Sequence, residues 1–235
     1  MANFKTHIQV SAIGSGVLST VLLGANIVNS IEAVLLWIVG ALGGVLPDID
    51  SDNSTTLNIL FGIITLLSIT AVLSQLGERV STLEIWVVIA LVYVVTNWVV
   101  RPIFESYTVH RGIFHSLLSS VFIGALSIVI AYEFTCLNAV MSWLVGFFIF
   151  IGYIIHLVLD EVYSVDFSNV RVKRSFGTAC KLYDYKNIQA SLLMLLLVFG
   201  MFFMVPNAQG VKSTLISKHT LVQIKDSFLP LALKS

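Results

Sequence analysis

The chain has 235 residues, of which 57% are hydrophobic and 11% are charged. A soluble domain carries roughly a quarter charged residues, and a disordered chain combines low hydrophobicity with high net charge, so both classes are excluded. Thirteen Lys and Arg balance thirteen Asp and Glu, which leaves no basic field to attract nucleic acid. The two cysteines do not make a disulfide framework. The composition predicts an integral membrane protein that does not bind nucleic acid.

Seven segments are apolar over about the 20 residues that a membrane-spanning helix needs. We therefore predict an all-α fold, a polytopic transmembrane helical bundle of about seven spans, with six as the alternative. The second segment, residues 31–46, is the shortest and is compatible with a tilted, shallow or partly re-entrant helix. The predicted spans are residues 8–28, 31–46, 57–76, 83–100, 116–135, 139–159 and 188–205.

Two features within the segments bear on how the helices pack. The first segment holds Ser11, Gly14, Ser15 and Gly16, which suit close contact between helices or else reflect loose local packing. Asn97, in the fourth segment, is a candidate for a hydrogen bond between helices.

The chain divides into an integral membrane domain, residues 1–205, and a C-terminal tail, residues 206–235. The tail has apolar residues at Leu221, Ile224 and Phe228, a spacing typical of a short amphipathic helix at the membrane interface. A loosely ordered end is the alternative.

Seven spans place alternate loops on opposite sides of the membrane. Outside the tail, all Lys and Arg except Arg79 fall at the N-terminus and in the loops after the fourth and sixth spans, which lie on the same side as the loop after the second span. By the positive-inside rule this side is cytoplasmic, which predicts a multi-pass protein of the inner (plasma) membrane. Cys136 and Cys180 fall on opposite sides, so we do not expect them to pair.

The unusual ionisable residues gather at the cytoplasmic ends of their spans. Four of the five histidines belong to this set, together with several carboxylates. His156 and Asp160 lie four residues apart, on one face of a helix. The candidate metal ligands are His7, Asp48, Asp50, His110, His115, His156 and Asp160.

Imidazole and carboxylate together suit zinc, with manganese or iron as alternatives. The set exceeds one tetrahedral site, so one or two ions are expected. Glu161 is a candidate general base, and Arg111 a candidate stabiliser of developing negative charge. Each residue also has an ordinary explanation alone: turn or interface carboxylates, a cap at His115 and Ser116, and a positive-inside anchor at Arg111.

The ordered motifs resemble those of the YdjM-type family of bacterial inner-membrane proteins, which are described as membrane-bound metal-dependent hydrolases. The motifs are Leu-Pro-Asp-Ile-Asp at 46–50, His-Arg-Gly-x-x-His-Ser at 110–116 and Gly-Tyr-x-x-His-x-x-x-Asp at 152–160, with an early histidine at position 7. The resemblance runs to about residue 182 and implies metal-dependent hydrolysis. It implies no substrate, and the region from residue 207 matches no motif of the family.

The His-x-x-x-Asp pair at a helix end is also similar to metal-binding helices of zinc-dependent phospholipase C and related single-strand nucleases. That short likeness implies phosphoester hydrolysis. The basic segment 171–177 resembles one found in part of the YdjM-type family. It suits a phosphate or lipid headgroup, or is a plain cytoplasmic loop.

Our leading hypothesis is therefore a metal-dependent hydrolase that acts on a lipid or lipid-linked phosphoester at the cytoplasmic membrane surface, with membrane lipids as its partners. One rival is a metal-ion or proton-coupled transporter, although such sites usually lie near the midplane on broken, repeated helices. Another is a membrane protein whose metal is purely structural. The sequence predicts no oligomeric state.

Overall fold

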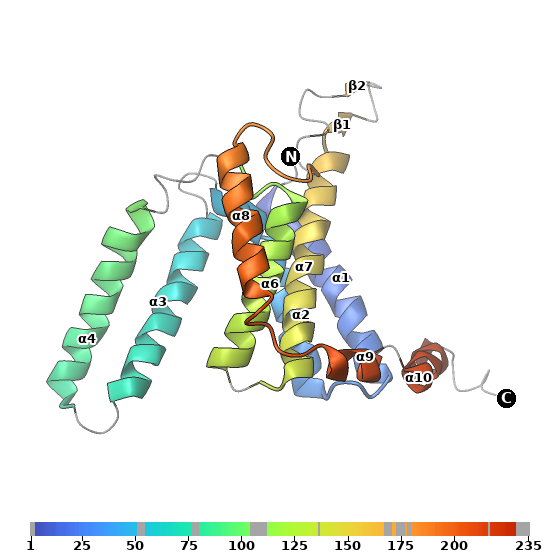
Figure 1. The fold of residues 1–235 in the computed structure, drawn as a ribbon, viewed down its shortest axis with the longest axis horizontal. Coiled ribbons are helices and arrows are strands. Elements are labelled where there is room, and N and C mark those ends of the chain that lie inside the picture. The colour runs from blue at the N-terminus through green and yellow to red at the C-terminus, as the bar shows by residue number, and fades with distance from the viewer. Residues whose placement is uncertain are drawn as a thin grey trace. The chain divides into compact units, whose positions relative to one another are not determined.

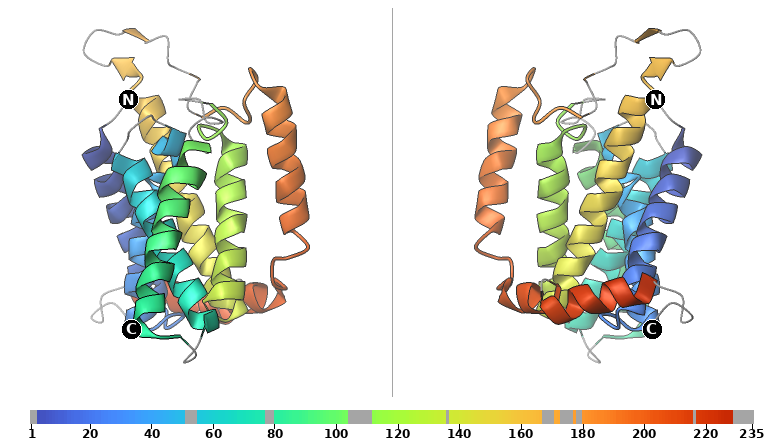
Figure 2. Two further views of the ribbon diagram at one scale, coloured as in Figure 1. Left: turned by 90° about the vertical axis from the view of Figure 1, so that its left-hand side faces the viewer. Right: turned by 90° about the vertical axis from the view of Figure 1, so that its right-hand side faces the viewer.

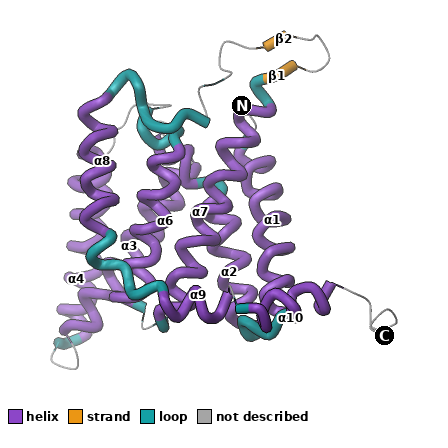
Figure 3. The backbone as a smooth tube through the Cα atoms, turned by 45° about the vertical axis from the view of Figure 1, so that its right-hand side comes forward, coloured by secondary structure: helices purple, strands orange, loops and turns teal. Residues whose placement is uncertain are grey.

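The computed structural model describes residues 3–50, 55–76, 80–103, 112–135, 137–166, 171–172, 177, 180–215 and 217–228. The regular elements in these ranges are helices, apart from a short antiparallel ribbon in which Val165 pairs with Val172, and loops and turns join them (Figures 1 and 3). The elements are α1 (Phe4–Gly24), α2 (Ser30–Gly43), η1 (Leu46–Asp50), α3 (Thr55–Leu76), α4 (Thr82–Val94), η3 (Val95–Val100), α6 (Leu117–Phe134), α7 (Ala139–Val162), β1 (Val165–Asp166), β2 (Arg171–Val172), α8 (Ile188–Met201), α9 (Gln209–Leu215) and α10 (Lys218–Phe228).

A helix overlaps each of the seven predicted spans, which confirms the helical class. Among the described residues, four helices are long and apolar enough to cross a membrane: Phe4–Gly24, Thr82–Ile103, Leu117–Phe134 and Ala139–Val162. The apolar helices α2 and α8 have 14 residues each, which is shorter than the usual span. The structure thus gives four candidate spans, and the count of seven stays a prediction.

The chain forms two compact units. The first unit comprises residues 1–47 and 115–235, and therefore α1, α2 and α6 to α10. Its hydrophobic core includes the buried side chains of Leu36, Leu144 and Phe148. The helices α1, α2, α6, α7 and α8 run roughly alongside one another, and α9 and α10 cross one end of this bundle (Figure 2). α1 begins at the opposite end.

Small residues bring α1, α2 and α7 into close contact. Ser15 donates its hydroxyl to the Trp37 carbonyl of α2 at 3.1 Å, and Ser11 donates to the Gly152 carbonyl of α7 at 3.5 Å. A Cβ on Gly152 would overlap the backbone of α2, and one on Gly44 would overlap Ser11. The small residues of the first predicted span therefore serve close packing.

The second unit, residues 48–114, contains the hairpin of α3 and α4. α4 continues into η3, a π-helical turn at residues 95–100. Asn97 in this turn donates its side-chain amide to Thr65 of α3 at 3.0 Å and to the Tyr93 carbonyl at 3.1 Å. The predicted hydrogen bond between helices is confirmed.

The tail forms two helices where the sequence predicted one. α9 packs against α7, and α10 packs against α1. Trp143 of α7 donates its indole N–H to the Pro206 carbonyl at 3.0 Å and so anchors the start of the tail. The location of these helices at a membrane interface stays a prediction.

Candidate metal centre

Four of the predicted ligands meet within the first unit. His7 lies in the first turn of α1, which Asn3 caps by accepting from the Thr6 N–H. His156 and Asp160 lie in the last two turns of α7. The four clustered residues are all buried: the exposed fractions of His7, His115, His156 and Asp160 are 1%, 1%, 0% and 3%.

The Asp160 carboxylate lies at the centre of the three imidazoles. Its Oδ1 is 3.3 Å from His7 Nε2, and its Oδ2 is 3.7 Å from His115 Nε2 and 3.9 Å from His156 Nε2. The His7 ring stacks on the His156 ring, with centroids 3.7 Å apart and 14° between the planes. Three Nε2 atoms thus point at one carboxylate.

A backbone carbonyl orients His156. Its Nδ1 is 2.8 Å from the oxygen of Gly44, and since a carbonyl can only accept, Nδ1 carries the proton. In this tautomer the lone pair of Nε2 faces Asp160. Metal-binding histidines are commonly held in the same way, with one ring nitrogen donating to a carbonyl or carboxylate and the other free to bind the metal. Gly44 reaches this position because α2 ends there, against Ser11 of α1.

The position of His115 follows from the way in which α6 begins. Ser116 is the N-cap and accepts from the Ser119 N–H at 3.2 Å. The free N–H groups of residues 117 and 118 donate to the Lys181 and Leu182 carbonyls at 2.9 and 3.0 Å. The Ser119 and Tyr153 hydroxyls are 3.0 Å apart and join α6 to α7. The cap explanation holds, and it places His115 in the cluster.

These residues fit a divalent metal ion. His7, His156 and Asp160 each offer one ligand atom, and the three atoms lie within 4.8 Å of one another. Tetrahedral ligands at 2.0–2.1 Å from zinc lie roughly 3.4 Å apart, close to the His7–Asp160 separation of 3.3 Å. His7 Nδ1 is buried and has no hydrogen-bond partner among the described residues. A mixed nitrogen and oxygen donor set is one that zinc, manganese and iron accept.

The remaining predicted site residues are Asp48, Asp50, His110, Arg111 and Glu161. Asp48 lies in η1, at the start of the second unit. The side chain of Asp50, and all of His110 and Arg111, lie outside the described residues. Glu161 follows Asp160 on α7, and one carboxylate oxygen accepts the Gly177 N–H.

The Cys180 thiol interacts electrostatically with the Asp160 and Glu161 carboxylates. Burial raises the pKa of the Cys180 thiol, and the Glu161 and Asp160 carboxylates add to this effect. The thiol is free and stays protonated near neutral pH.

The sequence analysis did not find the groups that support the cluster. The Gly44 carbonyl is a backbone acceptor, and no residue type reveals it. Tyr153 lies within the Gly-Tyr-x-x-His motif but contacts Ser119 through a hydroxyl pair that only the folded helices bring together. The sequence offered one signal for this contact: Tyr153 lies three residues before His156, on the same buried face of α7.

Fold and site together define a helical membrane protein with a buried cluster of three histidines and an aspartate. Over residues 1–205 the chain matches the family model described as YdjM inner membrane protein, and it belongs to that family. The match ends before the tail helices. No curated protein and no solved structure matches the chain significantly. The family name describes a protein of the inner membrane.

Proposed function

We propose that this protein is a membrane-embedded, metal-dependent hydrolase that acts on a phosphoester of a lipid or lipid-linked substrate. The observation that carries the proposal is the buried meeting of His7, His115, His156 and Asp160 at one end of α1 and α7. Buried ionisable groups in a membrane protein are costly unless they are paired or bind an ion, and they usually serve a function.

In this proposal, His7, His156 and Asp160 hold one divalent ion, with zinc as the first choice. Asp48, Asp50, His110 and His115 are the further ligands that we propose for this ion or a second one. A bound ion would polarise the scissile phosphoester as a Lewis acid. The Gly44 carbonyl keeps His156 in its ligating tautomer, and the buried helix ends around the cluster restrict access of bulk water.

Glu161 is the proposed general base. One of its oxygens is fixed by the Gly177 N–H, and the other, Oε2, is buried without a hydrogen-bond partner among the described residues. A carboxylate held by one oxygen leaves the second to accept a proton. We assign Arg111 the stabilisation of negative charge on the phosphoryl group.

A lipid substrate suits a site at the end of two candidate spans, because headgroups are concentrated at that depth. In the seven-span arrangement this end faces the cytoplasm, and the basic segment 171–177 would bind an anionic headgroup. Transport is less well supported. His7 lies in the first turn of α1 and Asp160 in the last turn of α7, whereas transporter sites usually lie near the midplane.

Metal content tests the first step. The purified full-length protein should retain a stoichiometric divalent metal, whereas Asp160→Asn and His156→Ala should lose most of it. His219→Ala is the matched control, because His219 is exposed on α10 and its loss should change nothing. Equal and low metal content in all four proteins would refute the metal site.

Chelation gives an independent readout. A ligand that binds only the folded state stabilises it by about 4 kcal/mol at a thousandfold excess over its Kd. EDTA should therefore lower the Tm of the wild-type protein by several degrees and leave that of Asp160→Asn unchanged. An identical shift in both proteins would mean that the chelator acts elsewhere.

Activity separates hydrolysis from its rivals. Phosphate or headgroup release from a panel of phospholipids, lost on chelation and restored by metal, supports the hydrolase. Metal flux into proteoliposomes without hydrolysis would support a transporter. Bound metal with neither activity would support a structural site.

A further inference from the structure

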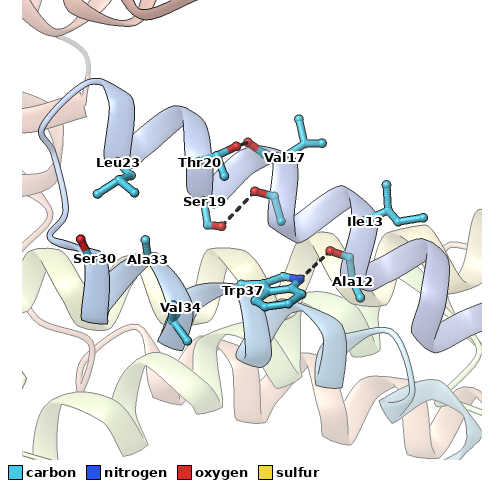
Figure 4. A pocket seen from close by; sticks show the side chains of 11 residues that line it. Ala12, Ile13, Val17, Ser19, Thr20, Leu23, Ser30, Ala33, Val34 and Trp37 are labelled. Atoms are coloured by element: carbon cyan, nitrogen blue, oxygen red, sulfur yellow. Dashed lines mark hydrogen bonds between the residues drawn. The ribbon is translucent and has the colours of Figure 1, made fainter.

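An open groove follows α1 and α2 in the half of the first unit that lies away from the metal centre (Figure 4). It is lined by residues 12–23 of α1 and 30–37 of α2 and has a volume of about 580 Å³. This volume is within the range of small-molecule binding sites, roughly 300–1,000 Å³. No step of the proposed hydrolysis uses the groove.

The hydroxyl groups of Ser19 and Thr20 and the indole N–H of Trp37 are all taken up by backbone carbonyls. Ser19 and Thr20 donate their hydroxyls to carbonyls of their own helix at 3.0 and 2.8 Å, and the Trp37 indole N–H donates to the Ala12 carbonyl at 2.8 Å (Figure 4). Ser30 lies at the end of the groove, where it is exposed. The rest of the lining is mainly aliphatic or small, so the groove suits a hydrocarbon occupant.

The groove has the length of one membrane leaflet. The 21 residues of α1 extend about 31 Å at 1.5 Å per residue, which matches the hydrocarbon core of about 30 Å. Residues 12–23 account for about 18 Å of this length. The groove therefore reaches from about the middle of α1, beside Trp37, towards the end of the bundle that α9 and α10 cross (Figure 2).

A partner helix is a poorer occupant than an acyl chain. Helices dock closely where small residues such as glycine are open, but here the Trp37 indole covers Gly16. A Cβ on Gly16 would lie 3.2 and 3.3 Å from two atoms of that ring. Ile13 and Val17 rise beside it, with exposed fractions of 67% and 59%. The remaining space is a channel between side chains and not a flat helix-docking face.

We propose that this groove binds one acyl chain of a membrane phospholipid from the leaflet opposite the His/Asp cluster. The end of the chain lies beside Ala12 and Trp37, and its glycerol end lies beside Leu23 and Ser30. The site is a lipid-binding site distinct from the metal centre, and it does not depend on the proposed hydrolysis.

Photo-crosslinking tests both the occupant and its direction. The full-length protein is reconstituted in vesicles of phosphatidylethanolamine and phosphatidylglycerol that contain a phosphatidylethanolamine probe with a diazirine on its acyl chain. A diazirine near the chain terminus should label peptides around Ala12 and Trp37, and one near the glycerol should label those around Leu23 and Ser30. The reverse pattern, or labelling no greater than on exposed α4, would overturn the proposal.

A matched pair of variants on α2 provides the control. Val34 lines the groove, whereas Ile38, one turn further on, does not, and their exposed fractions are 51% and 52%. Val34→Phe should reduce labelling of α1 and α2 several-fold, and Ile38→Phe should leave it unchanged. Equal labelling of both variants would contradict the proposal, as would crosslinks from the groove to a second copy of the chain.

The metal centre and the groove can be tested separately. The Asp160→Asn variant, which should lose its metal, should be labelled in the groove like the wild-type protein. Labelling that disappears with the metal would overturn the claim that the two sites are distinct.

Discussion

The helices α7 and α4 are similarly apolar, yet their surroundings differ. Half of the membrane-spanning window of α7 is buried within the described structure, against 6% of the window that begins with α4. The buried face of α7 carries small and polar residues, including Ser142, Gly152 and Tyr153, before it reaches His156 and Asp160. α4 instead exposes large side chains such as Trp86.

The contrast between α7 and α4 shows that hydropathy does not predict how far a membrane helix is enclosed by its neighbours. A polar group at membrane depth needs a partner inside the protein, so the helix that carries the cluster must be enclosed by neighbours. An apolar side chain has no such need, because lipid solvates it. Equal hydropathy therefore predicts membrane insertion for both helices, whereas polar and small residues predict which one is enclosed.

The largest expected difference between the two helices concerns matched leucines. Leu144 of α7 is 2% exposed and Leu91 of α4 is 61% exposed. Leu144→Ala removes buried contacts and leaves a cavity, which costs about 2–5 kcal/mol. Leu91→Ala should change the free energy of unfolding by less than about 0.5 kcal/mol, as exposed substitutions usually do. Unfolding of each variant in bicelles, followed by circular dichroism, measures both, and similar losses would remove the distinction.

Substitution of glycines tests overpacking instead of cavity formation, and the expected loss of stability is smaller. A Cβ on Gly152 of α7 would overlap the Gly40 carbonyl, whereas one on Gly62 of α3 meets nothing within 4 Å. Gly152→Ala should destabilise the first unit by about 1–3 kcal/mol through overpacking and should reduce metal retention, because it displaces Gly44 from His156. Gly62→Ala should be neutral or slightly stabilising, since alanine favours a helix. Thermal unfolding with metal analysis tests both, and retained metal in Gly152→Ala would contradict the link between packing and site.

The helices and part of the cluster could be predicted because each depends on a simple rule. A run of apolar residues long enough for a membrane indicates a helix whatever packs around it. His7, His156 and Asp160 lie at ends of helices that the loop order places on one side of the membrane. Their convergence therefore needed only the order of the spans.

The supporting structure depends on contacts that carry no residue signature. The Gly44 carbonyl orients His156 only because α1, α2 and α7 pack closely, and the close approach depends on which face each small residue occupies. The groove depends in the same way on where the Trp37 indole lies against Gly16. The apolar residues that predicted a tail helix, Leu221, Ile224 and Phe228, all lie in α10, whereas α9, which ends at Leu215, was not predicted.

The smallest expected effect belongs to the polar contact of the second unit. Asn97 donates to Thr65 at 3.0 Å, and hydrogen bonds between membrane helices contribute about 0.6 kcal/mol on average. Asn97→Ala and Thr65→Ala should each destabilise the hairpin slightly, and a double-mutant cycle should give a coupling energy near that value. The coupling is small because Asn97 keeps a second acceptor in the Tyr93 carbonyl, so the amide is not left unpaired. A coupling above about 2 kcal/mol, beyond the largest such values known, would mean that the second unit also depends on enclosed polar groups, and the contrast with α7 would fail.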